Sequence, residues 1–239
     1  MLKVAVPLDF KAAGTISESP YSVIARPIPK RHIEQVNQRW VAATEKGGAA
    51  RCVAVLNDGS YSHSLWRDTL HLSVLRSPPY ACFGLRSNAD AERLRAFPRH
   101  DQGEHEVRYR IMVGEGFGER EVSRAAQAMN IAPQWIVYHP GRERKPAAAR
   151  RKDEPFIKVS PSNVQIAALK KSERGNGLVV RLWEQASRKT KARVKLSGKS
   201  KAVETVIGPY GLKTLILQRR GGKLLARETN LIEAPAPPD

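Results

Sequence analysis

Short runs in which apolar and polar residues alternate constrain this chain more than any other feature. In the run HEVRYRIMV, Val107, Tyr109 and Ile111 fall on one side of an extended chain, and the arginines between them fall on the other. Similar runs rich in Val, Ile, Leu and Thr recur along the whole chain, separated by turns that contain Gly, Pro or Asn. The pattern predicts an all-β protein whose antiparallel strands form a sandwich or a barrel.

One stretch departs from this pattern and predicts a short helix. In residues 118–133, apolar side chains recur at intervals of three and four residues from Val122 to Met129, and Pro133 ends the stretch. No repeat of fixed period is present, so solenoids and propellers are not expected.

Composition divides the chain into two parts. The segment HPGRERKPAAARRKDEP is rich in proline and basic residues, and it has almost no large apolar side chains. Such a composition is typical of a linker or an exposed loop. We therefore predict a main β-sandwich domain over residues 1–140, a basic linker or loop over 141–155, and a smaller β module over 156–239.

The net charge of +18 belongs mainly to the second part of the chain. Residues 1–140 hold 18 Lys and Arg against 14 Asp and Glu, whereas residues 141–239 hold 23 against 9. The basic runs at 142–152 and 188–201 could neutralise phosphates, and such binding would weaken steeply with salt. No recognition helix, RNP-like aromatic signature or zinc finger accompanies them. We therefore favour a solvated basic surface, and nucleic-acid binding is the weaker alternative.

Targeting signals and cysteine spacing indicate in which cellular compartment the protein is expected. No run approaches the roughly 18 apolar residues of a membrane span, and the N-terminus has charges where a signal peptide would be apolar. Cys52 and Cys82 lie far apart without a CxxC or Cys/His ligand spacing. We read them as free thiols in a reducing compartment, and we expect a cytoplasmic protein that does not enter a membrane.

Motifs with a known chemistry are missing from the residues alone. GEGFG at 114–118 lacks the GxGxxG frame of a dinucleotide site, and no GxSxG, HExxH or Walker lysine is present. His63 and His71 lie eight residues apart on strand-like sequence, which favours surface or internally bonded histidines over metal ligands. A glycosidase needs two opposed carboxylates, and sequence alone cannot pair the acidic residues.

Several phrases in a fixed order resemble the C-terminal β-sandwich of glycoside hydrolase family 38, the α-mannosidases. They are TISESPYSVIARP, QRWVAATE, VAVLNDGSYSHSLWRDTLHLSVLRSP and HDQGEHEVRYRIMV. Beyond the linker, NVQIAALKKSERGNGLVVRLWEQ is similar to the terminal β module of that family, with Trp183 in place of the usual tyrosine. The resemblance extends from about residue 2 to residue 233.

This resemblance leads to an expected fold and to an expected lack of catalytic residues in this chain. The expected fold is a galactose-mutarotase-like supersandwich followed by a smaller β-sandwich. In the family, the zinc ligands and the nucleophilic aspartate belong to a catalytic domain that precedes the sandwich. We therefore expect no catalytic residue, no metal ligand and no cofactor in this chain, and we expect the zinc in the catalytic domain. The chain alone is predicted to be inactive.

The turn at LNDGSYSHS is the best candidate for a loop that approaches the substrate cleft of the intact enzyme. Asn57 and Asp58 can bond to the turn backbone through their side chains, Tyr61 can present a hydroxyl, and His63 lies nearby. Two interpretations stay open. The residues form a purely structural turn with Tyr61 packed on the next strand, or they line the cleft.

The resulting hypothesis is a non-catalytic part of an α-mannosidase that supports a catalytic domain in mannoside hydrolysis. The alternatives are a stand-alone module that binds carbohydrate or protein and, with less support, a basic nucleic-acid binder. The expected partners are the catalytic domain, a mannose-containing carbohydrate and a second copy of the chain. Loss of the catalytic domain should also leave an exposed apolar surface where it docked.

Overall fold

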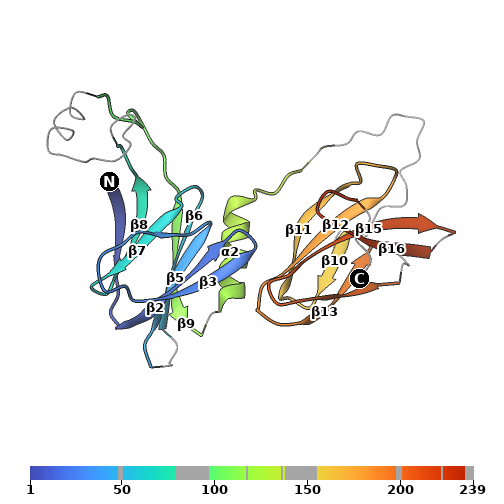
Figure 1. Cartoon of the computed structure of the whole chain (residues 1–239), viewed down its shortest axis with the longest axis horizontal. Helices are drawn as coiled ribbons and strands as arrows, with labels where there is room; N and C mark the ends of the chain where they lie inside the picture. The colour runs from blue at the N-terminus through green and yellow to red at the C-terminus, as the bar shows by residue number, and fades with distance from the viewer. Residues whose placement is uncertain are drawn as a thin grey trace. The chain divides into compact units, whose positions relative to one another are not determined.

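The structure is a computed structural model of the chain. It describes residues 1–47, 51–78, 97–116, 118–135, 137, 155–197, 201–221 and 223–234. Within these residues, the strands form four antiparallel sheets, and α2 (Glu119–Asn130) is the one helix (Figure 1). The predicted all-β sandwich fold with one short helix is therefore confirmed.

The chain divides into two compact units, Met1–Ala132 and Pro133–Asp239. Nearly all of the predicted linker, residues 141–155, lies outside the described residues. The predicted domain boundaries therefore stay a prediction. No helix within the described part of the chain is long and apolar enough to cross a membrane.

The first unit contains two sheets. Their strand orders are β1-β8-β7-β4 and β3-β2-β5-β6-β9, and every pairing is antiparallel. The strands are β1 (Leu2–Pro7), β2 (Ala12–Ser19), β3 (Ser22–Pro27), β4 (Gln35–Val36), β5 (Trp40–Glu45), β6 (Arg51–Asn57), β7 (Ser62–Trp66), β8 (Thr69–Leu75) and β9 (Tyr109–Glu115).

The core of the first unit lies between these two sheets. Val53 and Val55 of β6 meet Leu70 and Leu72 of β8 in one buried cluster. Because successive residues of a strand point to opposite faces, alternate positions of each strand enter this core. Apolar residues alternate in the sequence because every second side chain of a strand packs against the facing sheet.

Helix α2 covers the other face of the larger sheet, along β5 and β6. Val122 and Ala126 of the helix are buried, and Trp40 Nε1 of β5 donates a hydrogen bond to Ser123 Oγ at 3.1 Å. β5 and β6 are consequently covered on both faces, which explains why VAVL is continuously apolar rather than alternating. The helix begins after Gly118, whose N–H donates to Glu121 Oε2 at 3.1 Å.

The second unit is also a two-sheet sandwich, with strand orders β10-β13-β14 and β11-β12-β15-β16. Val180 and Leu182 of one sheet pack against Val194 and Ile207 of the other. The strands are β10 (Ile157–Ser160), β11 (Val164–Lys171), β12 (Leu178–Glu184), β13 (Thr190–Leu196), β14 (Val203–Ile207), β15 (Leu212–Arg220) and β16 (Lys223–Thr229).

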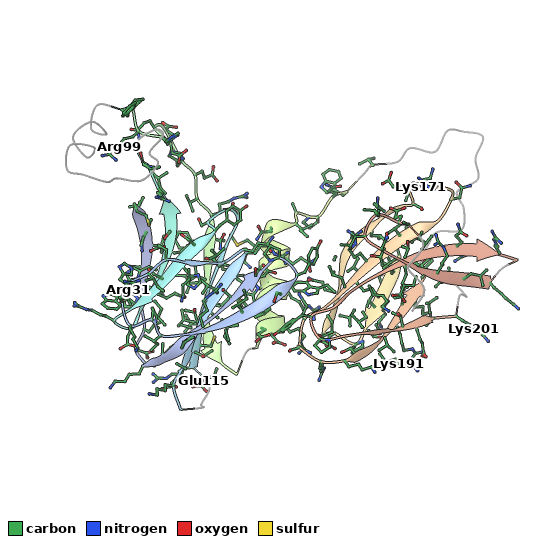
Figure 2. The ribbon with its side chains drawn as sticks, viewed as in Figure 1. Arg31, Arg99, Glu115, Lys171, Lys191 and Lys201 are labelled. Carbon is green, nitrogen blue, oxygen red and sulfur yellow. The ribbon has the colours of Figure 1, made fainter. Side chains whose placement is uncertain are left out.

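The basic run of the second unit is the outer face of β13. Its even-numbered positions are buried, while Lys191, Arg193 and Lys195 are exposed (Figure 2 labels Lys191). Glu204 of β14 lies 2.7 Å from Lys191 Nζ and 3.4 Å from Arg193 Nε. These contacts fit the solvated basic surface that the sequence favours.

Candidate functional site

The turn after β6 is held by the side chain of Asn57. Asn57 Oδ1 accepts hydrogen bonds from the N–H groups of Gly59 at 3.2 Å and Ser60 at 2.8 Å, and the residue is buried. Its own N–H donates to Arg39 O at 2.9 Å. The predicted capping of the turn by Asn57 is confirmed.

This turn carries the chain from one sheet to the other. β6 belongs to the larger sheet, whereas β7 belongs to the smaller one and forms a hairpin with β8. The hairpin closes through Arg67 and Asp68, whose φ angles of 48° and 53° suit a two-residue turn. The strand-like sequence around His63 forms β7, although several of the buried residues of this strand are polar.

Asp58 extends from the turn toward the segment that enters β9. Its carboxylate accepts a hydrogen bond from Arg108 Nε at 2.8 Å, and both side chains are partly exposed. Arg108 also lines an open depression of about 540 Å³ at the junction of β9 and the end of α2. The other lining residues are Val107, Tyr109, Arg110, Ala128 and Met129.

The depression combines apolar walls with positive charge. Met129 and Val107 supply apolar surface, and Arg110 has no acidic partner within the described residues. Such a surface can accept a polar ligand or a carboxylate. The alternation in the sequence places Arg108 and Arg110 on one strand face. No local pattern indicates that the end of α2, about twenty residues later, lies next to them.

Tyr61 and His63 lie in different environments. The Tyr61 side chain is 63% exposed, and its carbonyl accepts a hydrogen bond from Asn37 N at 3.2 Å. His63 is 0% exposed and points between the two sheets. The structure therefore brings Asn57, Asp58 and Tyr61 to the surface turn but places the His63 imidazole in the interior. Contact of these residues with substrate stays a prediction.

The His63 imidazole takes part in a buried hydrogen-bond network. Its Nδ1 lies 3.1 Å from Asn37 Oδ1, and its Nε2 lies 3.3 Å from Thr15 Oγ1. Because Asn37 Nδ2 donates to Ser60 O at 3.0 Å, the network assigns the proton of the neutral ring to Nδ1. Burial, with a further contribution from Arg26, lowers the pKa of His63 to about 4.

The stability of the first unit is therefore expected to fall on acidification. His63 is neutral in the folded chain down to about pH 4, while the unfolded chain protonates it near its ordinary value. Protons thus favour the unfolded state between about pH 6.5 and pH 4, at a cost of about 3 kcal/mol by linkage. Urea unfolding at several pH values checks this expectation.

The matched comparison uses two glutamine variants. His63→Gln should flatten the pH dependence in that interval, because the titrating group is gone. His105→Gln, at an exposed histidine, should leave the slope unchanged. A wild-type slope that persists in His63→Gln would contradict the expectation.

A second polar cluster lies on the outer face of the smaller sheet. Ser64 Oγ is 2.9 Å from His32 Nε2, a distance that a nucleophile and its base would need. However, Ser64 is fully buried, and Lys3 Nζ donates to its hydroxyl at 3.0 Å. Lys3 also bonds to Glu34, which accepts from Ser73 Oγ at 2.6 Å. We read the cluster as a network that fixes the segment around Glu34 to the sheet.

Metal-binding and thiol chemistry find little support in the described part of the chain. Among these residues, no group of three or more His, Cys, Asp or Glu side chains could hold a metal ion. The described residues therefore do not fit the zinc site that the family has in its catalytic domain. Cys52 is a buried free cysteine, and burial raises the pKa of its thiol to about 11. Cys82 lies outside the described residues.

Two parts of the chain match families of known proteins. Residues 1–83 match the glycosyl hydrolases family 38 C-terminal domain, and residues 163–236 match the family 38 C-terminal beta sandwich domain. The chain is a family 38 C-terminal region. The resemblance read from the sequence is thereby confirmed, and the two matches fall one in each sandwich of the family 38 region.

Solved structures agree on the fold of the family 38 region. An alpha-mannosidase from Enterococcus faecalis V583 aligns with a TM-score of 0.66 and 15% identity, covering 90% of this chain and 25% of that chain. A family 38 glycosyl hydrolase from Enterococcus faecalis aligns with a TM-score of 0.65 and 15% identity, covering 90% of this chain and 26% of that chain. The chain thus spans about a quarter of these proteins. No curated protein matches it.

Proposed function

We propose that this chain is the non-catalytic β-sandwich part of an α-mannosidase-like glycoside hydrolase. In this role it supports a catalytic domain that holds zinc and hydrolyses mannosides. The observation that carries the proposal is the pair of family 38 C-terminal matches, one in each unit. The alpha-mannosidase from Enterococcus faecalis V583 adds support, because this chain corresponds to about a quarter of its length.

The surface turn has a place in the same proposal. Asp58 bonds to Arg108, which lines the depression, and Tyr61 is an exposed residue of the same turn. These side chains can contact a mannose-containing carbohydrate in the cleft of the intact enzyme. Arginine and carboxylate groups hydrogen-bond sugar hydroxyls, and an exposed tyrosine can stack on a sugar ring. A cytoplasmic location belongs to this proposal as well.

An activity assay tests the supporting role. The purified chain is expected to give no hydrolysis of p-nitrophenyl α-mannoside, with or without added zinc, because the described residues offer no metal site. A catalytic domain of the family should gain stability or activity when this chain is added. Zinc-dependent turnover by the chain alone would contradict the proposal, as would the absence of any effect on the catalytic domain.

Two alanine variants test the turn in the assembled enzyme. Tyr61→Ala should raise KM about fivefold to tenfold, as expected for the loss of one contact worth ~1 kcal/mol. Val36→Ala is the matched control, because Val36 and Tyr61 are both 63% exposed in the same unit. Equal kinetics for the two variants would show that the Tyr61 side chain does not contact the substrate.

A further inference from the structure

β9 is the last strand of the larger sheet in the first unit. One of its edges pairs with β6 along all seven residues without a bulge. No described residue pairs with its other edge. Helix α2 packs on β5 and β6, so it covers a face of the sheet rather than this edge. The backbone donors and acceptors of this outer edge thus have no strand partner among the described residues and can pair with another strand.

The core-side face of β9 is apolar and exposed. Ile111 and Val113 pair with Val55 and Val53, so they share the face of the sheet that forms the core. Yet Tyr109, Ile111 and Val113 are 44%, 42% and 75% exposed. The smaller sheet therefore leaves this end of the core uncovered.

Up to Gly114, β9 also lacks the usual protection of an edge strand. Natural edges are blunted by lysine, proline, a bulge or a charge on the inward face. The sequence YRIMVGE has no proline or lysine, and its register is regular. Its one charge on the core-side face is Glu115, which pairs with Arg51 at the end of the strand (Figure 2), and Arg110 lies on the other face. An unprotected edge with an exposed apolar face is a docking surface for a further strand.

We propose that β9 pairs with β9 of a second copy of the chain, antiparallel and around a two-fold axis at Met112. Full overlap of the seven residues places Met112 opposite itself and Ile111 opposite Val113 of the other copy. A two-fold axis perpendicular to the sheet keeps the apolar faces on the same side. The larger sheets of the two copies join into one continuous sheet.

The strand is complementary to itself in charge as well as in shape. Arg110 lies opposite Gly114, and Tyr109 lies opposite Glu115, so no like charges face each other across the seam. Each Arg110 is four residues, or ~13 Å, from its counterpart along the strand. The apolar side chains of both copies then cover each other's exposed core-side faces. The inference is independent of the proposed function, because it concerns the chain by itself.

Sedimentation velocity of the full chain over a wide concentration range tests the pairing. A monomer–dimer equilibrium is expected. Val113→Lys should shift it to monomer, because the lysine would place a charge among apolar side chains at the seam. Val36→Lys, at an exposed valine of β4, should leave the equilibrium unchanged. A wild-type chain that is monomeric at every concentration would overturn the proposal, and so would a dimer that Val113→Lys does not affect.

Complementary charges test the register. Ile111→Glu alone should also give a monomer, for the same reason as Val113→Lys. An equimolar mixture of the two variants should form a heterodimer, because the proposed register sets the new glutamate opposite the new lysine. Absence of this rescue would exclude the register.

Disulfide trapping locates the axis. In a chain whose Cys82 is replaced by serine, Met112→Cys should form a linked dimer on mild oxidation, since Cα atoms about 4.5–5.5 Å apart suit a disulfide. Arg110→Cys, two residues away on the same face, should not link, because its counterpart lies ~13 Å away. Equal linking of both variants would contradict the axis at Met112. Hydrogen exchange of the β9 amides gives a further check. If exchange slows only when a catalytic domain is added, the edge binds that domain and the proposal is overturned.

Discussion

Replacement of Glu184 by alanine is expected to destabilise the second unit by about 3–5 kcal/mol. Glu184, at the end of β12, is 0% exposed, and its carboxylate accepts four hydrogen bonds. The donors are Asn163 Nδ2 at 2.7 Å and the N–H groups of Ala186, Arg188 and Tyr210 at 2.8, 3.2 and 3.1 Å.

The size of this effect follows from what alanine leaves behind. The carboxylate joins three separate turns, and without it the buried Asn163 amide and three partly buried backbone N–H groups lose their acceptor. Each unsatisfied buried donor costs about 1–3 kcal/mol, so the losses together are a large part of the stability of a small domain.

Hydrogen exchange measured by mass spectrometry resolves the effect within one unit. Peptides from β12 and β15 should lose protection in Glu184→Ala, while peptides from β5 and β6 of the first unit should not change. Glu204→Ala is the matched control, because its carboxylate is an exposed ion-pair partner of Lys191 and its loss should cost less than ~1 kcal/mol. Equal protection in the two variants would contradict this role of Glu184.

Replacement of Arg39 by methionine is expected to destabilise the first unit by about 3–5 kcal/mol. Glu18 of β2 is buried, and Arg39 holds it with two guanidinium hydrogen bonds, one of them from Nε at 2.9 Å. The Arg39 N–H donates to the same carboxylate at 3.1 Å. Methionine keeps most of the packing but leaves the Glu18 charge buried without its counter-charge.

A double variant distinguishes the loss of the Arg39–Glu18 ion pair from the cost of burying the Glu18 charge without a partner. Glu18→Leu combined with Arg39→Met removes both charges, and it should be more stable than Arg39→Met alone by ~1–3 kcal/mol. Arg108→Met serves as control, since the Arg108 side chain is largely exposed and its ion pair with Asp58 should contribute ~1 kcal/mol or less. Urea unfolding of the four chains gives these differences. A double variant less stable than the single one would refute the explanation.

Strands with apolar inward residues could be predicted from the sequence, and strands with polar inward residues could not. The runs of β6, β12 and β13 show their strand character through period-two or continuous apolar patterns. β2 was not predicted, because it buries polar residues such as Glu18. A polar residue can enter a core when its partner arrives from a distant segment, and a local pattern does not contain that partner.

In the candidate site, too, one part could be predicted from the sequence and another could not. The Asn57 turn could be predicted, because its hydrogen bonds reach residues only two and three positions away. The neighbouring depression could not, because it needs the end of α2 to meet the start of β9. Similarly, the alternation in HEVRYRIMV predicted which residues of β9 share a face, but not that this face would remain uncovered.

By itself, the sequence determined the secondary structure class, helix α2 and the family 38 resemblance, because these depend on residue types at short, regular spacings. Only the tertiary structure decided which polar side chains are buried, which arginines line the depression and which sheet edge has no partner among the described residues. Those properties depend on contacts between segments far apart in the chain, where burial and the presence of a partner set the energy of each group.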